Sequence, residues 1–173
     1  MSLDALFRQR PLFLAAFLIC IALIATALVM QYVSKLEPCP LCIFQRVFVI
    51  ALGGISLLAA IQDPGLMGRR VYGVLIVVFG VLGMVFAGRH LWLQNLPADQ
   101  VPECGPGLEY MLDAFPLTEA LSLVFRGSGE CAEVQWVFLG LSIPGWTLVI
   151  FTAFTIVGLL LIATRVAMPV REE

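Results

Sequence analysis

The sequence predicts an all-α membrane protein, a bundle of four transmembrane helices with a long outer loop between the third and the fourth. Hydrophobic side chains make up 61% of the 173 residues and charged ones only 13%, too few to cover a water-soluble surface. Four largely uncharged stretches also follow one another, each close to the roughly 20 residues that a helix needs to cross the hydrocarbon core. We therefore expect residues 1–173 to form a single membrane domain, and no basic run suggests binding to nucleic acid.

The first predicted span covers residues 12–33. Arg8 and Arg10 precede it, and the uncharged stretch continues to Ser34. A cleaved signal peptide is the alternative, with its cleavage site at residues 25–27. The apolar stretch runs past that site, which favours a retained helix. Cys20 lies among aliphatic residues in this span and is expected to be a packing residue.

The other spans are predicted at residues 43–62, 71–91 and 145–164. The second has few charge-free residues, so its helix must begin near Ile43 to cross the core, which places Arg46 below the membrane interface. Arg46 either snorkels back to the interface or has a functional role, and its position one turn below Cys42 favours the functional role. Small residues are expected to form packing faces on the second and third helices, namely Gly53, Gly54, Gly73, Gly80, Gly83, Ala87 and Gly88.

The basic residues predict the orientation of the bundle. One side of the four spans carries Arg8, Arg10, Arg69, Arg70, Arg165 and Arg171. Because cytoplasmic loops carry an excess of Lys and Arg, both termini are expected in the cytoplasm. The loops at 34–42 and 93–143 then face an oxidising, periplasm-like space. Within the long loop, the mostly apolar segment 115–125 is expected to form a short helix on the membrane surface.

The first candidate site is the segment 37–46, Glu-Pro-Cys-Pro-Leu-Cys-Ile-Phe-Gln-Arg. A disulfide between Cys39 and Cys42 closes too short a loop to stabilise the fold much, so this pair indicates redox chemistry or metal binding. The two prolines suit the entry of a helix, which we expect to begin close to Cys42. The positive helix N-terminus and the charge of Arg46 would both favour the thiolate form of Cys42.

A second pair of cysteines, Cys104 and Cys131, lies in the outer loop, where an oxidising compartment would let them pair. As a structural disulfide the pair would contribute about 3 to 4 kcal/mol by chain entropy. Glycines flank both cysteines, which predicts exposed, mobile sulfurs suited to thiol exchange. An outer pair in water and an inner pair at the membrane would pass electrons to a lipid-soluble acceptor. A quinone fits, since it takes the two electrons that a dithiol supplies.

The segment 37–46, the segment Gly-Glu-Cys-Ala-Glu-Val-Gln-Trp-Val-Phe-Leu-Gly-Leu at 129–141 and the four spans together resemble the DsbB family. The resemblance covers nearly the whole chain. It implies a multi-pass thiol:quinone oxidoreductase of the bacterial inner membrane, with a quinone (ubiquinone or menaquinone) as acceptor and no metal. In bacteria the periplasm is kept oxidising by electron flow from DsbA, a thioredoxin-fold dithiol protein, through DsbB to quinone.

The resemblance further implies an order of exchange among the cysteines. Reduced DsbA would attack the disulfide between Cys104 and Cys131 at Cys104. Cys131 would then exchange with Cys39, and Cys42 would be released as a thiolate next to the quinone. Re-formation of the bridge between Cys39 and Cys42 would accompany the departure of quinol.

Three polar residues match positions that the DsbB family uses at its quinone site. Arg46 takes the place of the family's arginine, Gln31 that of a nearby polar residue, and His90 that of a histidine whose spacing to Cys104 differs by one residue. Gln31 and His90 also have a simpler interpretation as polar residues at the membrane interface. Gln45 stands where some relatives carry an acidic residue, so a carboxylate role at that position does not carry over.

Three other functions compete with this hypothesis. A protein resembling vitamin K epoxide reductase would also pair a membrane CxxC with loop cysteines, but the order of the elements differs. A metal-binding membrane protein could use four thiolates, although Cys104 and Cys131 are far apart for a zinc site and the chain has a single histidine. A non-enzymatic scaffold or transporter with a disulfide in its outer loop would leave Cys39 and Cys42 unexplained.

Overall fold

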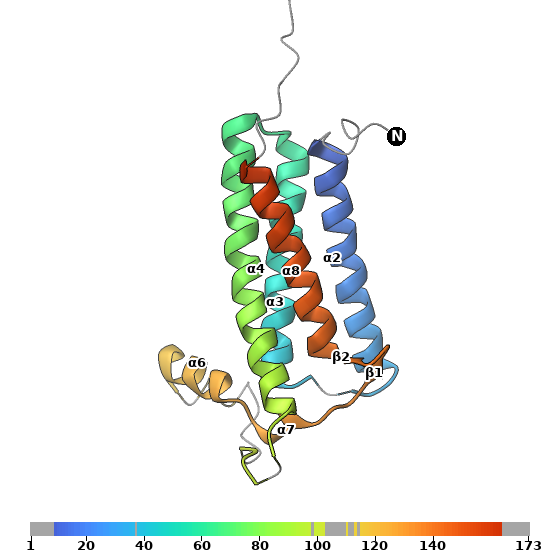
Figure 1. The fold of residues 1–173 in the computed structure, drawn as a ribbon, viewed down its shortest axis with the longest axis vertical. Helices are drawn as coiled ribbons and strands as arrows, with labels where there is room; N and C mark the ends of the chain where they lie inside the picture. Colours follow the sequence, from blue (N-terminus) through green and yellow to red (C-terminus); the bar gives the residue numbers. More distant parts are fainter. Residues whose placement is uncertain are drawn as a thin grey trace, which may run out of the picture.

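Four long helices form a bundle in the computed structural model (Figure 1). The structure describes residues 9–36, 38–97, 99–102, 110, 113 and 115–163. The long helices are α2 (Gln9–Tyr32), α3 (Pro40–Gln62), α4 (Leu66–Gln94) and α8 (Ile143–Ala163). All four are long and apolar enough to cross a membrane, and the predicted fold class is confirmed.

All four long helices begin earlier than the predicted spans, and the starts of α3 and α4 have clear local causes. α3 starts at Pro40 because a proline suits the first helical position, where no N–H is needed, and Cys39 forms the cap before it. α4 starts at Leu66, directly after Gly65, so that Arg69 and Arg70 lie inside the helix and not in a loop before it. These bounds describe helices, and the exact membrane spans stay predictions.

Close contact between α4 and α8 depends on glycine. A Cβ atom on Gly73 would lie 3.0 Å from the carbonyl oxygen of Gly158, and one on Gly80 would lie 2.5 Å from a side chain of α8. Such small residues let helix backbones approach each other in a membrane, as predicted for these two positions. Gly54 and Gly88, in contrast, have no neighbour within 4 Å of an added Cβ, so the expected packing role is wrong for them.

The bundle buries its interior and exposes apolar side chains outward. Cys20 is 2% exposed and packs against Gly53 of α3, as expected for a packing residue. On the outside, Leu18, Ile50 and Ile156 are each more than half exposed. A belt of such side chains suits lipid, because in water it would form a large exposed apolar surface.

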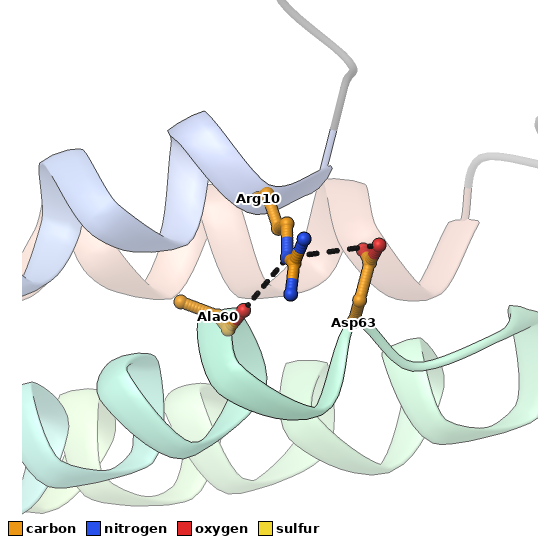
Figure 2. A network of polar contacts seen from close by, with 3 residues as sticks. All are labelled: Arg10, Ala60 and Asp63. Carbon is orange, nitrogen blue, oxygen red and sulfur yellow. Dashed lines mark hydrogen bonds and ion pairs between the residues drawn. The ribbon is translucent and has the colours of Figure 1, made fainter.

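A polar contact joins α2 to α3 at the end of the bundle where the chain enters α2 (Figure 2). The Nε atom of Arg10 donates a hydrogen bond of 3.2 Å to the carbonyl oxygen of Ala60 and lies 3.7 Å from a carboxylate oxygen of Asp63. The arginine thereby supplies a donor and a positive charge to the C-terminus of α3, where carbonyls lack helical partners. Both charged side chains are more than half exposed, so the ion pair itself contributes little stability.

The opposite end carries the smaller elements (Figure 1). These are α6 (Leu117–Arg126), α7 (Gly129–Ala132) and a hairpin of β1 (Val137–Phe138) and β2 (Leu141–Ser142). Helix α6 overlaps the segment 115–125, which was predicted to form a short helix, and ends one residue beyond it. Arg89 of α4 donates two hydrogen bonds of 2.9 Å to the carbonyls of Phe125 and Arg126, which holds the end of α6 against the bundle.

Candidate active site

The Cys39–Cys42 pair lies at the start of α3. Cys39 is the N-cap residue, and its sulfur accepts a 3.4 Å hydrogen bond from the backbone N–H of Cys42. The two sulfurs are 3.0 Å apart, and both cysteines are free. The helix N-terminus therefore acts on Cys39 directly, whereas the sequence led us to expect that the sulfur of Cys42 would face the unpaired N–H groups.

Cys131 lies against Cys39 and is fully buried. It packs with Cys39 in an apolar cluster that also contains Leu41, Leu93 and Val124. The expectation of an exposed sulfur at Cys131 is thus wrong, because α7 folds its only cysteine inward. The other member of the predicted outer pair, Cys104, lies outside the described residues.

The environment of Cys131 favours its protonated form. Interaction with the Cys39 side chain raises the pKa of Cys131, and burial raises it further. Backbone hydrogen bonds with Ser128 and Leu41 act in the opposite direction but do not outweigh these effects. As long as Cys39 is a free partner, Cys131 is a poor nucleophile at neutral pH.

His90 of α4 lies next to both sulfurs of the pair. Its Nε2 atom is 3.8 Å from the sulfur of Cys39, and its Nδ1 atom is 3.9 Å from that of Cys42 and 3.2 Å from the side-chain nitrogen of Gln45. The ring is 3% exposed. Two sulfurs and an imidazole within 4.8 Å of one another are also donors that zinc accepts, although a closed zinc site has four ligands.

A cavity of about 320 Å³ opens beside the pair, between α2, α3, α8 and the hairpin. Most of its lining is apolar, including Trp136 and Trp146. Its polar lining consists of Thr26, Gln31, Cys42, Gln45, Arg46, Gln135 and Thr147. Cys42 lines this cavity, whereas Cys39 lines only a neighbouring cavity of about 20 Å³.

Arg46 and Gln31 meet at the polar end of the larger cavity. Arg46 donates one hydrogen bond to the side-chain oxygen of Gln31 and a second, of 3.3 Å, to the carbonyl oxygen of Ala27. Both contacts cross from α3 to α2, so they fix the guanidinium beside the cavity. No acidic side chain is paired with Arg46 among the contacts that the described residues make, which leaves its charge to act on a bound molecule.

The structure thus divides the predicted site residues between two places. Cys39, Cys131 and His90 lie together on the inner side of the pair, while Arg46 and Gln31 line the larger cavity with Cys42. Thr147 was not among the predicted site residues. Its hydroxyl donates a 2.6 Å hydrogen bond to Gln45, and only the fold brings these two residues together.

The chain matches known proteins over almost its full length. The family model described as disulfide bond formation protein DsbB matches residues 9–161. A disulfide bond formation protein B from Nitrosococcus oceani is 57% identical over 87% of this chain and 89% of its own length. A protein of the same description from Saccharophagus degradans is 56% identical over 87% of this chain and 91% of its own length. Another from Marinobacter nauticus is 50% identical over 91% of this chain and 94% of its own length. The chain therefore belongs to the DsbB family of disulfide bond formation proteins.

Proposed function

We propose that this protein makes disulfides by taking electrons from a reduced thioredoxin-fold partner of the DsbA type and passing them to a membrane quinone. Its family is one of disulfide bond formation proteins, which supports an oxidoreductase role in a membrane. The observation that carries the quinone-linked proposal is the position of the Cys39–Cys42 pair. Cys39 is in contact with Cys131, and Cys42 lines an apolar cavity with an arginine.

The contacts support a definite order of thiol exchange. The partner dithiol reduces the disulfide between Cys104 and Cys131, which releases Cys131 as a thiolate. Cys131 then attacks Cys39 in the Cys39–Cys42 disulfide, forms a bond to Cys39 and releases Cys42 as a thiolate at the cavity. The packing of Cys131 and Cys39 in one buried cluster supports this step.

The cavity suits the ring of a quinone. Its apolar walls would hold the ring, and the two tryptophans offer flat surfaces for stacking. When bound, a quinone would supply the two-electron acceptor that the dithiol lacks. Arg46 would stabilise negative charge that develops on a ring oxygen close to Cys42, and Gln31 would hold the arginine in position.

We also propose that the dithiol end faces the periplasm and both termini the cytoplasm of the inner membrane. Arg10, Arg69 and Arg70 lie in the described structure at the end of the bundle away from Cys39. The other basic residues that support this orientation, Arg8, Arg165 and Arg171, lie outside the described residues. The excess of arginine at one end is what cytoplasmic ends of membrane helices carry.

Orientation is tested with two variants in a background where all five cysteines are serine. Ser34→Cys introduces a thiol in the loop before α3, and Gln62→Cys introduces one at the other end of α3; both positions are exposed. A membrane-impermeant thiol reagent added to spheroplasts should label the first variant and spare the second. The reverse pattern would place the dithiol in the reducing cytoplasm and reject the proposal.

The activity is tested by mixing the purified protein with reduced DsbA and a soluble quinone and following quinol formation. One quinol is expected for each disulfide formed in DsbA. Cys39→Ser and Cys42→Ser should stop the reaction, while Cys20→Ser, a matched change in a packing residue, should retain it. A wild-type protein that forms no quinol, or a Cys42→Ser variant that does, would overturn the proposal.

A further inference from the structure

A chain of side-chain hydrogen bonds runs from α8 through α3 to α4 behind the dithiol. Thr147 donates through its hydroxyl to the side-chain oxygen of Gln45 at 2.6 Å. The nitrogen of the same amide lies 3.2 Å from Nδ1 of His90, whose Nε2 lies 3.8 Å from the sulfur of Cys39. Gln45 and His90 are each 3% exposed, so bulk water does not compete for these contacts.

The direction of each hydrogen bond follows from the first one. An amide whose oxygen accepts from Thr147 directs its NH₂ group at His90, so Nδ1 of the ring must accept. A neutral imidazole has one donor and one acceptor nitrogen, which leaves the proton on Nε2. We propose that Gln45, oriented by Thr147, is a positioning residue that fixes His90 as the Nε2–H tautomer and directs this proton at the sulfur of Cys39.

This arrangement would treat the two sulfurs of the dithiol differently. Cys39 faces a ring nitrogen that carries a proton, whereas Cys42, 3.9 Å from Nδ1, faces one that carries none. A thiolate at Cys39 would be stabilised by an N–H donor, whereas a thiolate at Cys42 would face the cavity that Arg46 also lines. The ring proton of His90 therefore serves Cys39 and not Cys42.

The consequence for thiol exchange rests on the proposed function. After Cys131 has bonded to Cys39, a thiolate at Cys104 attacks the sulfur of Cys131. The bond between Cys104 and Cys131 forms, the bond between Cys131 and Cys39 breaks, and Cys39 leaves with the electron pair as a thiolate. The Nε2–H group of His90 stabilises that leaving group by hydrogen bonding, which accelerates the step.

Nitrogen NMR on the reduced, ¹⁵N-histidine-labelled protein in detergent tests the tautomer directly, because the chain contains a single histidine. The wild type should carry its ring proton on Nε2. In Gln45→Glu the carboxylate can only accept, so the proton should move to Nδ1 or the ring should bind a second proton. Thr147→Val removes the donor that orients the amide and should yield a mixture of tautomers.

A matched control is Gln62→Glu, which changes a glutamine at the other end of α3 and should leave the ring unchanged. In rapid mixing, Gln45→Glu should slow the release of Cys39 about tenfold if the proton moves to Nδ1, the effect of losing one hydrogen bond to a charged group. If the ring instead binds a second proton, Nε2 keeps its N–H group and the release should not slow. A wild-type proton on Nδ1 would overturn the inference. It would mean that the side-chain amide of Gln45 is turned over and that the Thr147 hydroxyl donates to the carbonyl oxygen of Pro144, 3.0 Å away. An unchanged tautomer in Gln45→Glu would also overturn the inference.

The tautomer is read without turnover, so the two proposals can fail separately. If the wild type forms no quinol while its proton lies on Nε2, the proposed function falls and the positioning of His90 remains. If quinol forms while the proton lies on Nδ1, the function remains and the role of Gln45 falls.

Discussion

Cys131 packs with Cys39 in one buried apolar cluster, although the two residues lie far apart in the sequence. The contact brings the loop cysteine to one sulfur of the membrane dithiol and leaves the other sulfur at the cavity. Exchange between the two cysteine pairs would then need little movement of α7 once Cys131 is free. This geometry leads to a direct cross-linking prediction.

A disulfide between Cys39 and Cys131 should form readily when their usual partners are removed. In the Cys42→Ser/Cys104→Ser variant, mild oxidant is expected to join the two within one protein molecule, as mass spectrometry of proteolytic peptides would show. The matched variant Cys39→Ser/Cys104→Ser retains Cys42 and should form the corresponding link more slowly. Equal rates in both variants would contradict the preferred contact with Cys39.

The reactivity of Cys131 should depend on pH through Cys39. Because interaction with the Cys39 side chain raises the pKa of Cys131, the thiol should stay protonated to higher pH and react slowly with iodoacetamide near neutrality. Cys39→Ala removes the largest cause, so the curve of alkylation rate against pH should move to lower pH. The comparison uses a Cys104→Ser background, with Cys42→Ala as a control for access. A curve that stays in place would show that Cys39 does not hold the proton of Cys131.

Arg46→Met should weaken quinone use more than partner use. The variant loses the positive charge at the cavity and both contacts to α2, so KM for a soluble quinone should rise about tenfold. KM for reduced DsbA should change little, because Arg46 does not contact Cys131 or α7 in the described structure. Steady-state assays that vary each substrate separate the two effects, and an equal rise in both constants would argue against a quinone site. Gln31→Leu should also raise KM for the quinone, but by a smaller factor.

Gly158→Ala should destabilise the bundle. The added methyl group would lie 2.9 Å from the carbonyl oxygen of Gly73, a backbone atom that cannot turn aside, and 2.8 Å from a methyl group of Val77. Pushing α4 and α8 apart should lower the free energy of unfolding by about 1 to 3 kcal/mol. Thermal unfolding in detergent, followed by circular dichroism, measures the change. Gly88→Ala, where an added methyl group has no neighbour, should match the wild type, and a similar loss in both variants would discount helix packing as the cause.

The four helices could be predicted because a membrane requires long apolar stretches, and their order follows from charges and turns between them. The small elements could not. Each strand of the β1–β2 hairpin has two residues, too few to show an alternating pattern, and its turn places Leu139 at a positive φ of 51°, which apolar residues seldom adopt. The sequence therefore did not predict that this hairpin lines the cavity.

The cysteines, Arg46 and His90 could be identified from spacing and family likeness, but their surroundings could not. Glycines beside Cys131 suggested exposure, yet burial is decided by contacts with Leu41 and Leu93, which lie far away in the chain. The contact between Gln45 and Thr147 depends on how α3 packs near α8 and leaves no local pattern. The reactive groups follow from the sequence, whereas the contacts that orient them depend on the fold.

The two cavities beside the dithiol affect which thiols an oxidant from the membrane could reach. On the proposed function, a lipid-borne oxidant that enters the larger cavity would meet Cys42, because the described residues that line it include neither Cys39 nor His90. Stray oxidation of client cysteines by the lipid pool would thereby be limited, and oxidising power would leave the bilayer as a disulfide.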